Sequence, residues 1–420
     1  MRMTIRRSSL YGSLRAPPSK SYTQRALFCS ALAQGESKLH SPLMCDDTRA
    51  TSHALLEIGV ASEWNNQIAR VTRYGELKKP SGTIFCGESG TTLRFMTAIC
   101  ATTPHEAYIS GGPSLLKRPV KDLAIALRQL GATCESEQGY PPVQVCGPIK
   151  GGSVAIPGNV SSQYISALLL AAPLAEIPVE IGVSGRLESR SYVKMTLDMQ
   201  NKFGVRVDAT DDFTKFRTQG GTYYPAQVQV EGDWSSAAFL LVGAAIAGER
   251  VRVNGLTEAS VQADRRLIGV LEEMSAEVNQ DSESVMVEKS QFQSVQIDVS
   301  DCPDLFPAVC ALCAVTEGVS KVTGIRRLRI KESNRVLAMS DGLRQMGIST
   351  EESEDSLLIH GARPRNAILD PHRDHRIAMA FAVLALCTDQ ATIVDGECVS
   401  KSYPSFWSDL RSLGARVIAA

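Results

Sequence analysis

Lysines, arginines and carboxylates of this chain gather at the starts of segments that have the length and composition of helices. Lys20, Asp304 and Arg376 each stand at such a start. The N-terminus of a helix exposes free N–H groups and the positive end of the helix dipole, and a lysine or arginine adds a full charge beside it. Such groups favour a small substrate with several negative charges, and phosphate and carboxylate match guanidinium best. Carboxylates in the same loops would supply acid and base.

Two classes of loop hold these residues. The first class leads from a strand into an apolar helix, and the second leads into the amphipathic helix that follows. The first class supplies Lys20, Ser21, Arg25, Glu88, Ser89, Gly90, Thr91, Arg94, Ser161, Ser162, Gln163, Asp304, His375 and Arg376. The second supplies Asp46, Asp47, Arg118, Ser189, Tyr192, Arg327, Arg329, Lys331, Glu332, Arg335 and Lys401.

Each of these residues also has an ordinary structural explanation. Ser161, Ser162 and Asp304 could only cap helices, which is a common use of serine and aspartate. His375 could make a structural hydrogen bond, and a single lysine in a loop is often just solvated. The joint set, rather than any one residue, indicates function.

The elements that must position these side chains recur at a fixed period. The apolar helices begin near Ser19, Ser89, Ser161, Trp234, Asp304 and Asp374, at spacings of 70, 72, 73, 70 and 70 residues. Each amphipathic helix ends near Gly59, Gly131, Gly204, Ala276, Gly347 or Gly414. A fixed period predicts one supersecondary unit used six times.

The third unit shows the expected order most clearly. We predict strands over 153–156 and 179–183, helices over 161–175 and 192–203, and final strands over 205–209 and 226–230, which is the order βαβαββ. Similar patterns predict a strand and a helix over 321–323 and 335–346, and again over 391–394 and 405–413. The first helix of each unit is apolar nearly all round, so it should lie inside, and the second should lie outside. Six units divide most simply into two lobes of three.

Composition excludes several classes of function. The chain of 420 residues is 44% hydrophobic and 21% charged, with a formal net charge of −1, so no overall field favours nucleic acid or an anionic membrane. No secretory signal or membrane-spanning apolar run is evident, which makes the cytoplasm the expected location. The eleven cysteines show no metal-ligand spacing, and no glycine-rich nucleotide loop is present. We therefore expect neither metal nor cofactor.

Five segments together resemble the 5-enolpyruvylshikimate-3-phosphate (EPSP) synthase family, in order and over essentially the whole chain. They are 18–27 (PSKSYTQRAL), 90–94 (GTTLR), 158–163 (GNVSSQ), 329–335 (RIKESNR) and 374–379 (DHRIAM). The resemblance implies an α/β (α+β) fold of two lobes, each an inside-out barrel of three βαβαββ units around buried parallel helices. It implies an N-terminal lobe over 15–226, mainly on the shikimate 3-phosphate side. The other lobe, 1–14 with 227–420, would carry phosphoenolpyruvate and the catalytic groups.

The implied reaction moves the enolpyruvyl group of phosphoenolpyruvate to the 5-hydroxyl of shikimate 3-phosphate, in the route to chorismate and the aromatic amino acids. By resemblance, the catalytic residues are Asp304, as base for the hydroxyl, and Glu332, Lys20 and Lys401. A lysine among several cations should have a lowered pKa that suits proton transfer. Shikimate 3-phosphate would contact Lys20, Ser21, Arg25, Ser161, Ser162, Gln163, Ser189, Tyr192, Asp304 and Lys331. Phosphoenolpyruvate would contact Lys20, Gly90, Arg118, Gln163, Glu332, Arg335, His375, Arg376 and Lys401.

Two positions depart from some relatives, which carry Asn where this chain has Glu88 and Arg327. A competing interpretation is the sister transferase that acts on UDP-N-acetylglucosamine. It typically has a reactive Cys in the loop after Gly-Gly, where this chain has Pro113, and an Asn after its early Lys, where this chain has Ser21. A non-catalytic, repeat-built binding protein and an RNA-end enzyme on a related repeat are two further candidates. The expected partners are the two small substrates alone, with no nucleic acid and no membrane, and the chain is expected to be a monomer.

Overall fold

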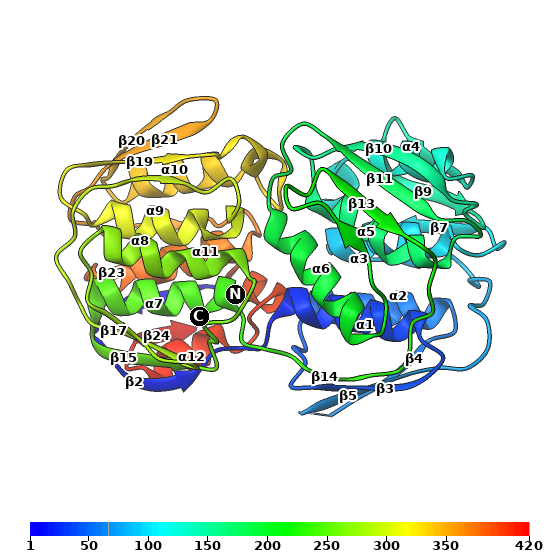
Figure 1. Ribbon diagram of the computed structural model, residues 1–420. Helices are drawn as coiled ribbons and strands as arrows, with labels where there is room; N and C mark the ends of the chain where they lie inside the picture. Colours follow the sequence, from blue (N-terminus) through cyan, green and yellow to red (C-terminus); the bar gives the residue numbers. More distant parts are fainter. Residues whose placement is uncertain (66, 420) are drawn as a thin grey trace. The chain divides into compact units, whose positions relative to one another are not determined.

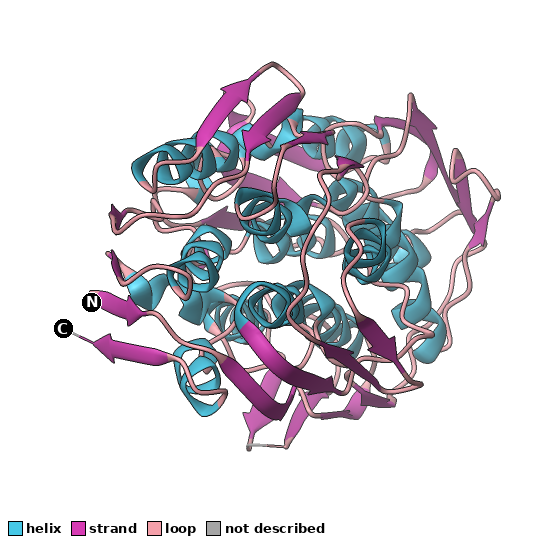
Figure 2. Ribbon diagram, turned by 90° about the vertical axis from the view of Figure 1, so that its left-hand side faces the viewer, coloured by secondary structure: helices cyan, strands magenta, loops and turns pink. Residues whose placement is uncertain are grey.

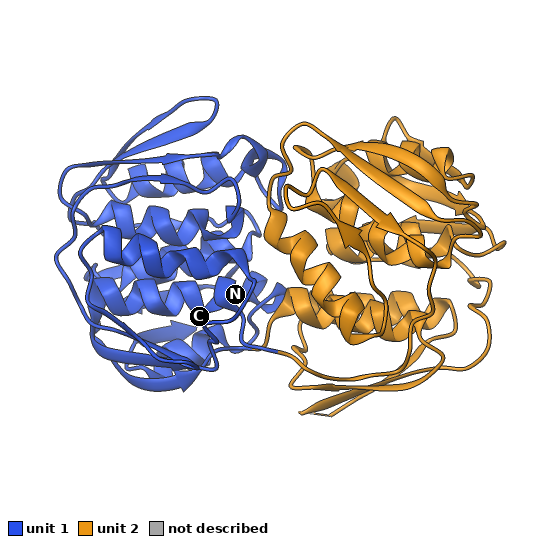
Figure 3. Ribbon diagram, viewed as in Figure 1, with its two compact units in different colours: residues 1–17, 231–420 blue, residues 18–230 orange. Residues whose placement is uncertain are grey.

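Six sheets of four strands form the framework of the computed structural model, which describes residues 1–65 and 67–419. Contacts between residues divide the chain into two compact units (Figure 3). Unit 1 comprises Met1–Pro17 with Glu231–Ala420, and unit 2 comprises Pro18–Val230. The chain therefore passes from one unit to the other at 17/18 and at 230/231. The resemblance implies lobe boundaries at 14/15 and 226/227, three and four residues earlier.

Unit 2 contains three repeats, each with one apolar and one amphipathic helix. The first comprises α1 (Lys20–Leu32), β3 (Gly35–His40), α2 (Asp46–Glu57), β4 (Ala61–Trp64) and β5 (Ile68–Arg73). The second comprises β6 (Ile84–Phe85), α3 (Gly90–Cys100), β7 (Ala107–Ser110), η1 (Leu115–Lys117), α4 (Lys121–Gln129), β8 (Thr133–Glu137) and β9 (Tyr140–Cys146). The third comprises β10 (Gly152–Pro157), α5 (Ser162–Ala171), η2 (Ala172–Leu174), β11 (Val179–Ser184), α6 (Arg190–Lys202), β12 (Asp208–Ala209) and β13 (Lys215–Thr218).

Unit 1 repeats the same order. Its first repeat comprises β2 (Leu10–Arg15), α7 (Trp234–Ala247), β15 (Gly248–Asn254), η3 (Ala263–Arg266), α8 (Leu267–Glu273), β16 (Val278–Gln280) and β17 (Ser284–Val287). The second comprises β18 (Gln296–Asp298), η4 (Pro303–Leu305), α9 (Phe306–Ala314), β19 (Val319–Thr323), η5 (Arg326–Ile330), α10 (Arg335–Gln345), β20 (Ser349–Glu352) and β21 (Ser356–His360). The third comprises β22 (Ile368–Leu369), α11 (His375–Ala385), β23 (Gln390–Ile393), η6 (Gly396–Lys401), α12 (Phe406–Ser412), β24 (Arg416–Ala419) and β1 (Met3–Arg6).

Each sheet has one parallel pairing, which involves an edge strand, and two antiparallel pairings, as in the order β10-β11-β13-β12. The prediction that 226–230 ends the third repeat was wrong. The strand there, β14 (Gln227–Gln229), pairs in parallel with β3 and completes the sheet of the first repeat. The true last strand, β13, was missed because Phe216 is its one large apolar residue inside a polar stretch.

The apolar helices form the centre of each unit; Figure 2, which faces unit 1, shows strands outside the helices. Every residue of α7, α9 and α11 is buried, and these three helices pack side by side in unit 1 (Figure 1). Burial on all sides explains why these segments show no polar face in the sequence. The amphipathic helices bury one face only; α4, for example, buries Leu123, Ala124, Ala126 and Leu127.

Five of the six apolar helices begin within one residue of the expected position, with a polar cap. The side chains of Ser19, Ser89, Ser161, Asp233 and Asp374 each accept a hydrogen bond from a backbone N–H in the first turn.

The start of the fifth apolar helix and the end of the third apolar helix differ from the predicted limits. Asp304 lies inside the 3-10 helix η4, and α9 begins only at Phe306, because prolines at 303 and 307 supply no backbone N–H to the first turns. In the third repeat, α5 ends at Ala171 and a 3-10 turn containing Pro173 follows, so the helix expected over 161–175 is shorter.

Candidate active site

Arg335 organises a buried group of charges in unit 1. Its guanidinium is almost fully buried and contacts three carboxylates: Nε lies 2.8 Å from Asp374 Oδ2, one terminal nitrogen 2.8 Å from Asp304 Oδ1, and the other 2.8 Å from Glu332 Oε2. Burial alone would lower the pKa of Arg335, but Asp374, Glu332 and Asp304 outweigh it and hold the pKa well above its usual value. Arg335 is therefore a permanent cation at the start of α10.

Asp304 lies between two arginines. Its Oδ1 accepts from Arg335, and its Oδ2 lies 2.8 Å from a terminal nitrogen of Arg376. Burial by itself would raise the pKa of this carboxyl, but Arg376, Arg335 and Lys331 together hold the pKa below its usual range. Asp304 is thus an ionised carboxylate in a fixed position.

Asp374 joins the starts of α10 and α11, and the sequence motifs did not place it among the site residues. It is completely buried and caps α11 by accepting from the backbone N–H of Arg376 at 3.0 Å. Its other oxygen accepts from Arg335 Nε and, at 3.2 Å, from Ser333 Oγ. The signal in the sequence is its place directly before His375, which by itself indicates only the start of a helix.

Lys331, in the same group of charges as Arg335 and Asp304, has a lowered pKa. Burial lowers its pKa, Asp304 opposes that effect, and Arg327 and Arg335 lower it further, to about 8. A lysine in this state exists both charged and neutral close to physiological pH. The lowered pKa expected for a catalytic lysine is not tested at Lys20 and stays a prediction there.

His375 and Lys401 lie close to the same elements. His375 is the first residue of α11, is buried, and has Nδ1 3.9 Å from Asp374 Oδ1. Lys401 ends the 3-10 helix η6, which packs on α11, and only 8% of its surface is exposed. The starts of α9, α10 and α11 therefore bring Asp304, Arg335, His375 and Arg376 together, with Glu332 and Lys331 just before α10.

In unit 2, the starts of α1 and α2 meet. Lys20 Nζ lies 2.8 Å from Asp47 Oδ2, and both side chains are largely buried. Ser21 follows Lys20 in the first turn of α1. Gln24, one turn later, donates from its amide to Ser89 Oγ at 2.9 Å, so the start of α3 lies beside α1.

Arg25 connects α1 to α6. Its Nε donates to Thr196 Oγ1 at 2.9 Å, and its terminal nitrogens donate to the carbonyls of Tyr192 at 2.9 Å and Ser21 at 3.0 Å. Burial lowers the pKa of Arg25 to about 10. Arg25 therefore positions two other expected site residues through their backbone. Tyr192 lies in the first turn of α6, next to Ser189, which has a left-handed conformation with φ of 57°.

The starts of α3 and α5 bring a second set together. Gln163 donates to Thr91 Oγ1 at 3.0 Å and accepts from Arg94. A side chain at Gly90 would place its Cβ 2.9 Å from terminal nitrogens of both Arg118 and Arg94, so it would displace both guanidinium groups. Ser161 caps α5, which confirms the structural explanation for it without excluding a contact with substrate, and Ser162 begins the helix.

The two positions that depart from some relatives both make structural contacts. Glu88 accepts from the backbone N–H groups of Leu115, at 2.8 Å, and Ser114, at 3.3 Å. It thereby anchors the turn that precedes Arg118. Arg327 donates to the carbonyl of Ser300 at 2.7 Å, next to the segment that carries Asp304.

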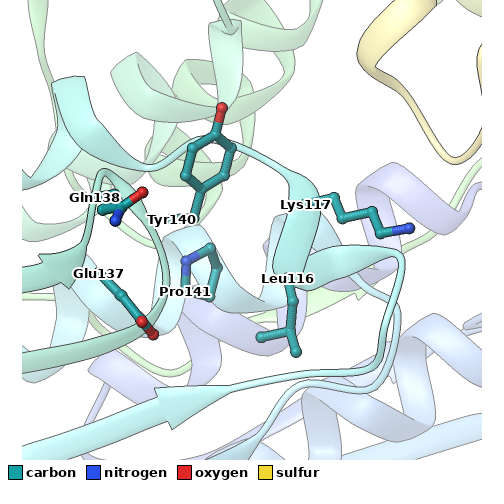
Figure 4. A pocket seen from close by; sticks show the side chains of 6 residues that line it. All are labelled: Leu116, Lys117, Glu137, Gln138, Tyr140 and Pro141. Atoms are coloured by element: carbon teal, nitrogen blue, oxygen red, sulfur yellow. The ribbon is translucent and has the colours of Figure 1, made fainter.

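Two hollows on the outside of the units contain none of the expected site residues. One, of about 490 Å³ in unit 2, is lined by Leu116, Lys117, Glu137, Gln138, Tyr140 and Pro141 (Figure 4). The other, of about 750 Å³ in unit 1, is lined by Arg7, Gly347, Ala362, Arg363, Pro364, Arg365, Asn366 and Asp389. Among the described residues, no helix is long and apolar enough to cross a membrane.

Comparison with solved structures identifies the class of fold. EPSP synthase from Acinetobacter baumannii superposes over 100% of both chains with a TM-score of 0.83 at 28% identity. The enolpyruvyl transferase NikO from Streptomyces tendae covers 99% of this chain and 98% of its own with a TM-score of 0.79; at 14% identity this likeness shows the fold alone. The fold is therefore that of the enolpyruvyl transferases, and the expected fold class is confirmed.

Sequence comparison narrows the class to one family. The family model for EPSP synthase (3-phosphoshikimate 1-carboxyvinyltransferase) matches residues 5–410. A 3-phosphoshikimate 1-carboxyvinyltransferase of Dehalococcoides mccartyi is 41% identical over 419 residues, covering 100% of this chain and 99% of the relative. That of Methanoculleus marisnigri is 42% identical over 405 residues, covering 95% and 96%. This chain belongs to the EPSP synthase family, as its sequence motifs predicted.

Proposed function

We propose that this chain transfers the enolpyruvyl group of phosphoenolpyruvate to the 5-hydroxyl of shikimate 3-phosphate and releases phosphate, in the route to chorismate and the aromatic amino acids. The observation that carries this proposal is the match to relatives named 3-phosphoshikimate 1-carboxyvinyltransferase, at about 40% identity over the whole chain. The clustered arginines and carboxylates at the helix starts of unit 1 support it, because both substrates are anions.

The reaction needs a proton donor and a proton acceptor. In the first step C3 of the enol gains a proton while the 5-hydroxyl oxygen bonds to C2 and loses its own proton, which gives a tetrahedral adduct. In the second step C3 loses a proton, the bond from C2 to the phosphate oxygen breaks, and the departing phosphate takes up a proton. Each step therefore adds one proton to the reacting groups and removes one, which acid–base side chains in fixed positions can do.

Asp304 is the proposed base for the 5-hydroxyl. Its two arginine partners hold it in place but also make it a weak base, because they stabilise the carboxylate. The phosphate and carboxylate of phosphoenolpyruvate compete for the same guanidinium groups. Their binding would therefore weaken the hold of Arg376 and Arg335 on Asp304 and raise its affinity for a proton at the moment when the substrate is present.

The remaining proton transfers are assigned to Glu332, Lys20 and Lys401. Glu332 is fixed by Arg335 at 2.8 Å, and Lys20 is held by Asp47 at the same distance. Lys401 is buried beside α11. Carboxylate and ammonium groups can take up and return the proton at C3.

The two substrates are assigned to overlapping sets of residues. Arg25 belongs to the first set and positions the backbone of two of its other members, because it donates hydrogen bonds to the carbonyls of Ser21 and Tyr192. Shikimate 3-phosphate is assigned to Lys20, Ser21, Arg25, Ser161, Ser162, Gln163, Ser189, Tyr192, Asp304 and Lys331. Phosphoenolpyruvate is assigned to Lys20, Gly90, Arg118, Gln163, Glu332, Arg335, His375, Arg376 and Lys401.

Phosphate release by the purified chain tests this function. We expect release only when phosphoenolpyruvate and shikimate 3-phosphate are both present, with one phosphate for each enolpyruvyl product detected by mass spectrometry. No release above background across a range of both substrates would refute the proposal. Release with UDP-N-acetylglucosamine in place of shikimate 3-phosphate would favour the sister transferase, which the family match does not support.

The assembly and the location of the chain stay predictions. We propose a monomer, which light scattering of the purified chain would test, and a cytoplasmic enzyme, which fractionation of cells that make it would test.

A further inference from the structure

Asp264 is a buried carboxyl group on an element that packs against α7, as η4 with the proposed base Asp304 also does, and none of the roles above uses it. It lies in the 3-10 helix η3, which packs on α7, and only 2% of its surface is exposed. Its Oδ2 accepts a hydrogen bond from Ser235 Oγ, in the first turn of α7. Its Oδ1 is buried and has no hydrogen-bond partner among the residues that the structure describes.

The surroundings of Asp264 disfavour its charge. Burial is the main cause that raises its pKa, and the negative charge of Asp304 raises it further. Arg376 and the hydrogen bond from Ser235 oppose these effects, and the resulting pKa is about 7. Among the described residues, Asp233, at the start of α7, and Cys302, just before η4, also interact with it.

The two neighbouring carboxyls are unequal in their partners. Asp304 has two arginines at 2.8 Å, whereas Asp264 has one serine hydroxyl and an unpaired oxygen. When two acids interact and only one is well paired, the poorly paired acid keeps its proton longer. A neutral carboxyl also costs far less to bury with an unpaired oxygen than a carboxylate does.

We propose that Asp264 is a positioning residue for proton transfer at Asp304: it gains and loses a proton beside that carboxylate and so sets how strongly Asp304 attracts the proton of the attacking hydroxyl. This inference rests on the proposed function, in which Asp304 is the base. With Asp264 neutral, its repulsion of the charge on Asp304 is absent, and the two arginines keep Asp304 a weak base. With Asp264 ionised, the two negative charges repel each other, and transfer of the hydroxyl proton to Asp304 relieves the repulsion.

The pH dependence of kcat tests the proposal. For the wild-type chain we expect kcat to rise by up to about tenfold between pH 6 and pH 8, as expected for one ionisation near 7. Asp264→Asn is isosteric with the neutral acid and keeps an acceptor for Ser235, so kcat should stay near the low-pH value throughout this range. A variant that retains the wild-type rise would overturn the proposal.

Ser235 provides a second pair of variants. Ser235→Ala removes the hydrogen bond that favours ionised Asp264, so the midpoint of the rise in kcat should move to higher pH by about half to one pH unit. Ser235→Thr keeps the hydroxyl and should restore the wild-type midpoint. A midpoint that is the same in all three proteins would overturn the proposal, even if Asp264→Asn does not fold. A merely structural role for Asp264 would lower kcat equally at every pH.

A measurement without substrate separates this inference from the proposed function. The pKa of Asp264 is higher in the folded chain than the value of about 3.9 expected when it is unfolded, so the folded state binds the extra proton. The wild type should therefore lose stability relative to Asp264→Asn as pH rises from about 4 to about 7, and the difference between their Tm values should grow. A difference that is constant with pH would refute the titration of Asp264, whereas absence of phosphate release by the wild type would refute the function instead.

Discussion

At the scale of single residues, the position of Asp304 between Arg335 and Arg376 explains how the proposed base is held in a fixed place. Both arginines are buried and both contacts are 2.8 Å long. The carboxylate is therefore held in place before substrates bind, and its basicity depends on what else the arginines contact.

Replacing Asp304 by Asn should remove proton transfer while keeping the shape of the side chain. We expect kcat to fall by about 10²–10⁴-fold, because that is the usual contribution of a positioned general base, while KM for both substrates changes little. Steady-state kinetics and calorimetric binding of shikimate 3-phosphate would measure the two effects separately. Parallel loss of binding and turnover would show that Asp304 has a structural role instead.

Arg335 should be essential for the stability of unit 1. Arg335→Met removes a buried cation that contacts three carboxylates, which should cost about 3–5 kcal/mol of unfolding free energy. Denaturation by urea would measure the loss. Arg344→Met is a matched control on the same helix, where the exposed pair with Asp341 should contribute less than about 1 kcal/mol. Equal effects of the two substitutions would contradict the central role of Arg335.

Lys331 should make substrate binding sensitive to alkaline pH. Its lowered pKa of about 8 means that it loses its positive charge as pH rises above 8, so KM for shikimate 3-phosphate should increase there. Lys331→Arg stays charged and should move this increase to higher pH. The dependence of KM on pH between 7 and 9.5 is the measurement, and a variant whose KM rises over the same pH range as in the wild type would exclude Lys331 as the cause.

At the scale of elements, the starts of helices do the positioning. Gln24 and Gln163 connect the starts of α1, α3 and α5 in unit 2, and Arg335 and Asp374 connect those of α9, α10 and α11 in unit 1. Hydrophobic pattern and polar caps predicted five of the six apolar helix starts closely. The exception is α9, where two prolines displace the start, and β13 was missed because too few of its residues are apolar.

The start of α3 permits a test of the need for glycine. Gly90→Ala should push the guanidinium groups of Arg118 and Arg94 away by a small amount, because the added Cβ would lie 2.9 Å from both. We expect a higher KM for phosphoenolpyruvate and a smaller change for shikimate 3-phosphate, with the fold retained, since the displaced atoms end flexible side chains. Gly82→Ala, where the added Cβ meets nothing within 4 Å, is the control. Equal KM shifts for both substrates would contradict the assignment.

At the scale of the whole molecule, the ends of the chain complete sheets that lie far away in the sequence. β1 pairs with both β23 and β24 in unit 1, and β2 pairs in parallel with β15. In unit 2, β14 completes the first sheet beside β3. Each unit is therefore closed by a strand from the opposite end of its own sequence, which a repeat pattern cannot reveal.

Removal of β1 should destabilise unit 1 much more than removal of β24. β1 is an inner strand of the sheet β22-β23-β1-β24, whereas β24 is an edge strand. Deletion of residues 1–6 breaks two strand pairings, and deletion of residues 416–420 breaks one. Limited proteolysis and thermal unfolding of the two truncated chains would compare them. A greater loss of stability from the C-terminal deletion would contradict this topology.

The sequence by itself determined the six-fold repeat, the type and approximate limits of most helices, the family, and which residues carry charge at the helix starts. Those properties are local: they depend on periodicity, caps and short motifs. The tertiary structure alone decided that Asp374 joins Asp304 and Glu332 around Arg335, that Lys331 has a lowered pKa, and that Asp264 lies beside the proposed base. These properties arise between residues far apart in the chain and depend on burial, which only packing creates.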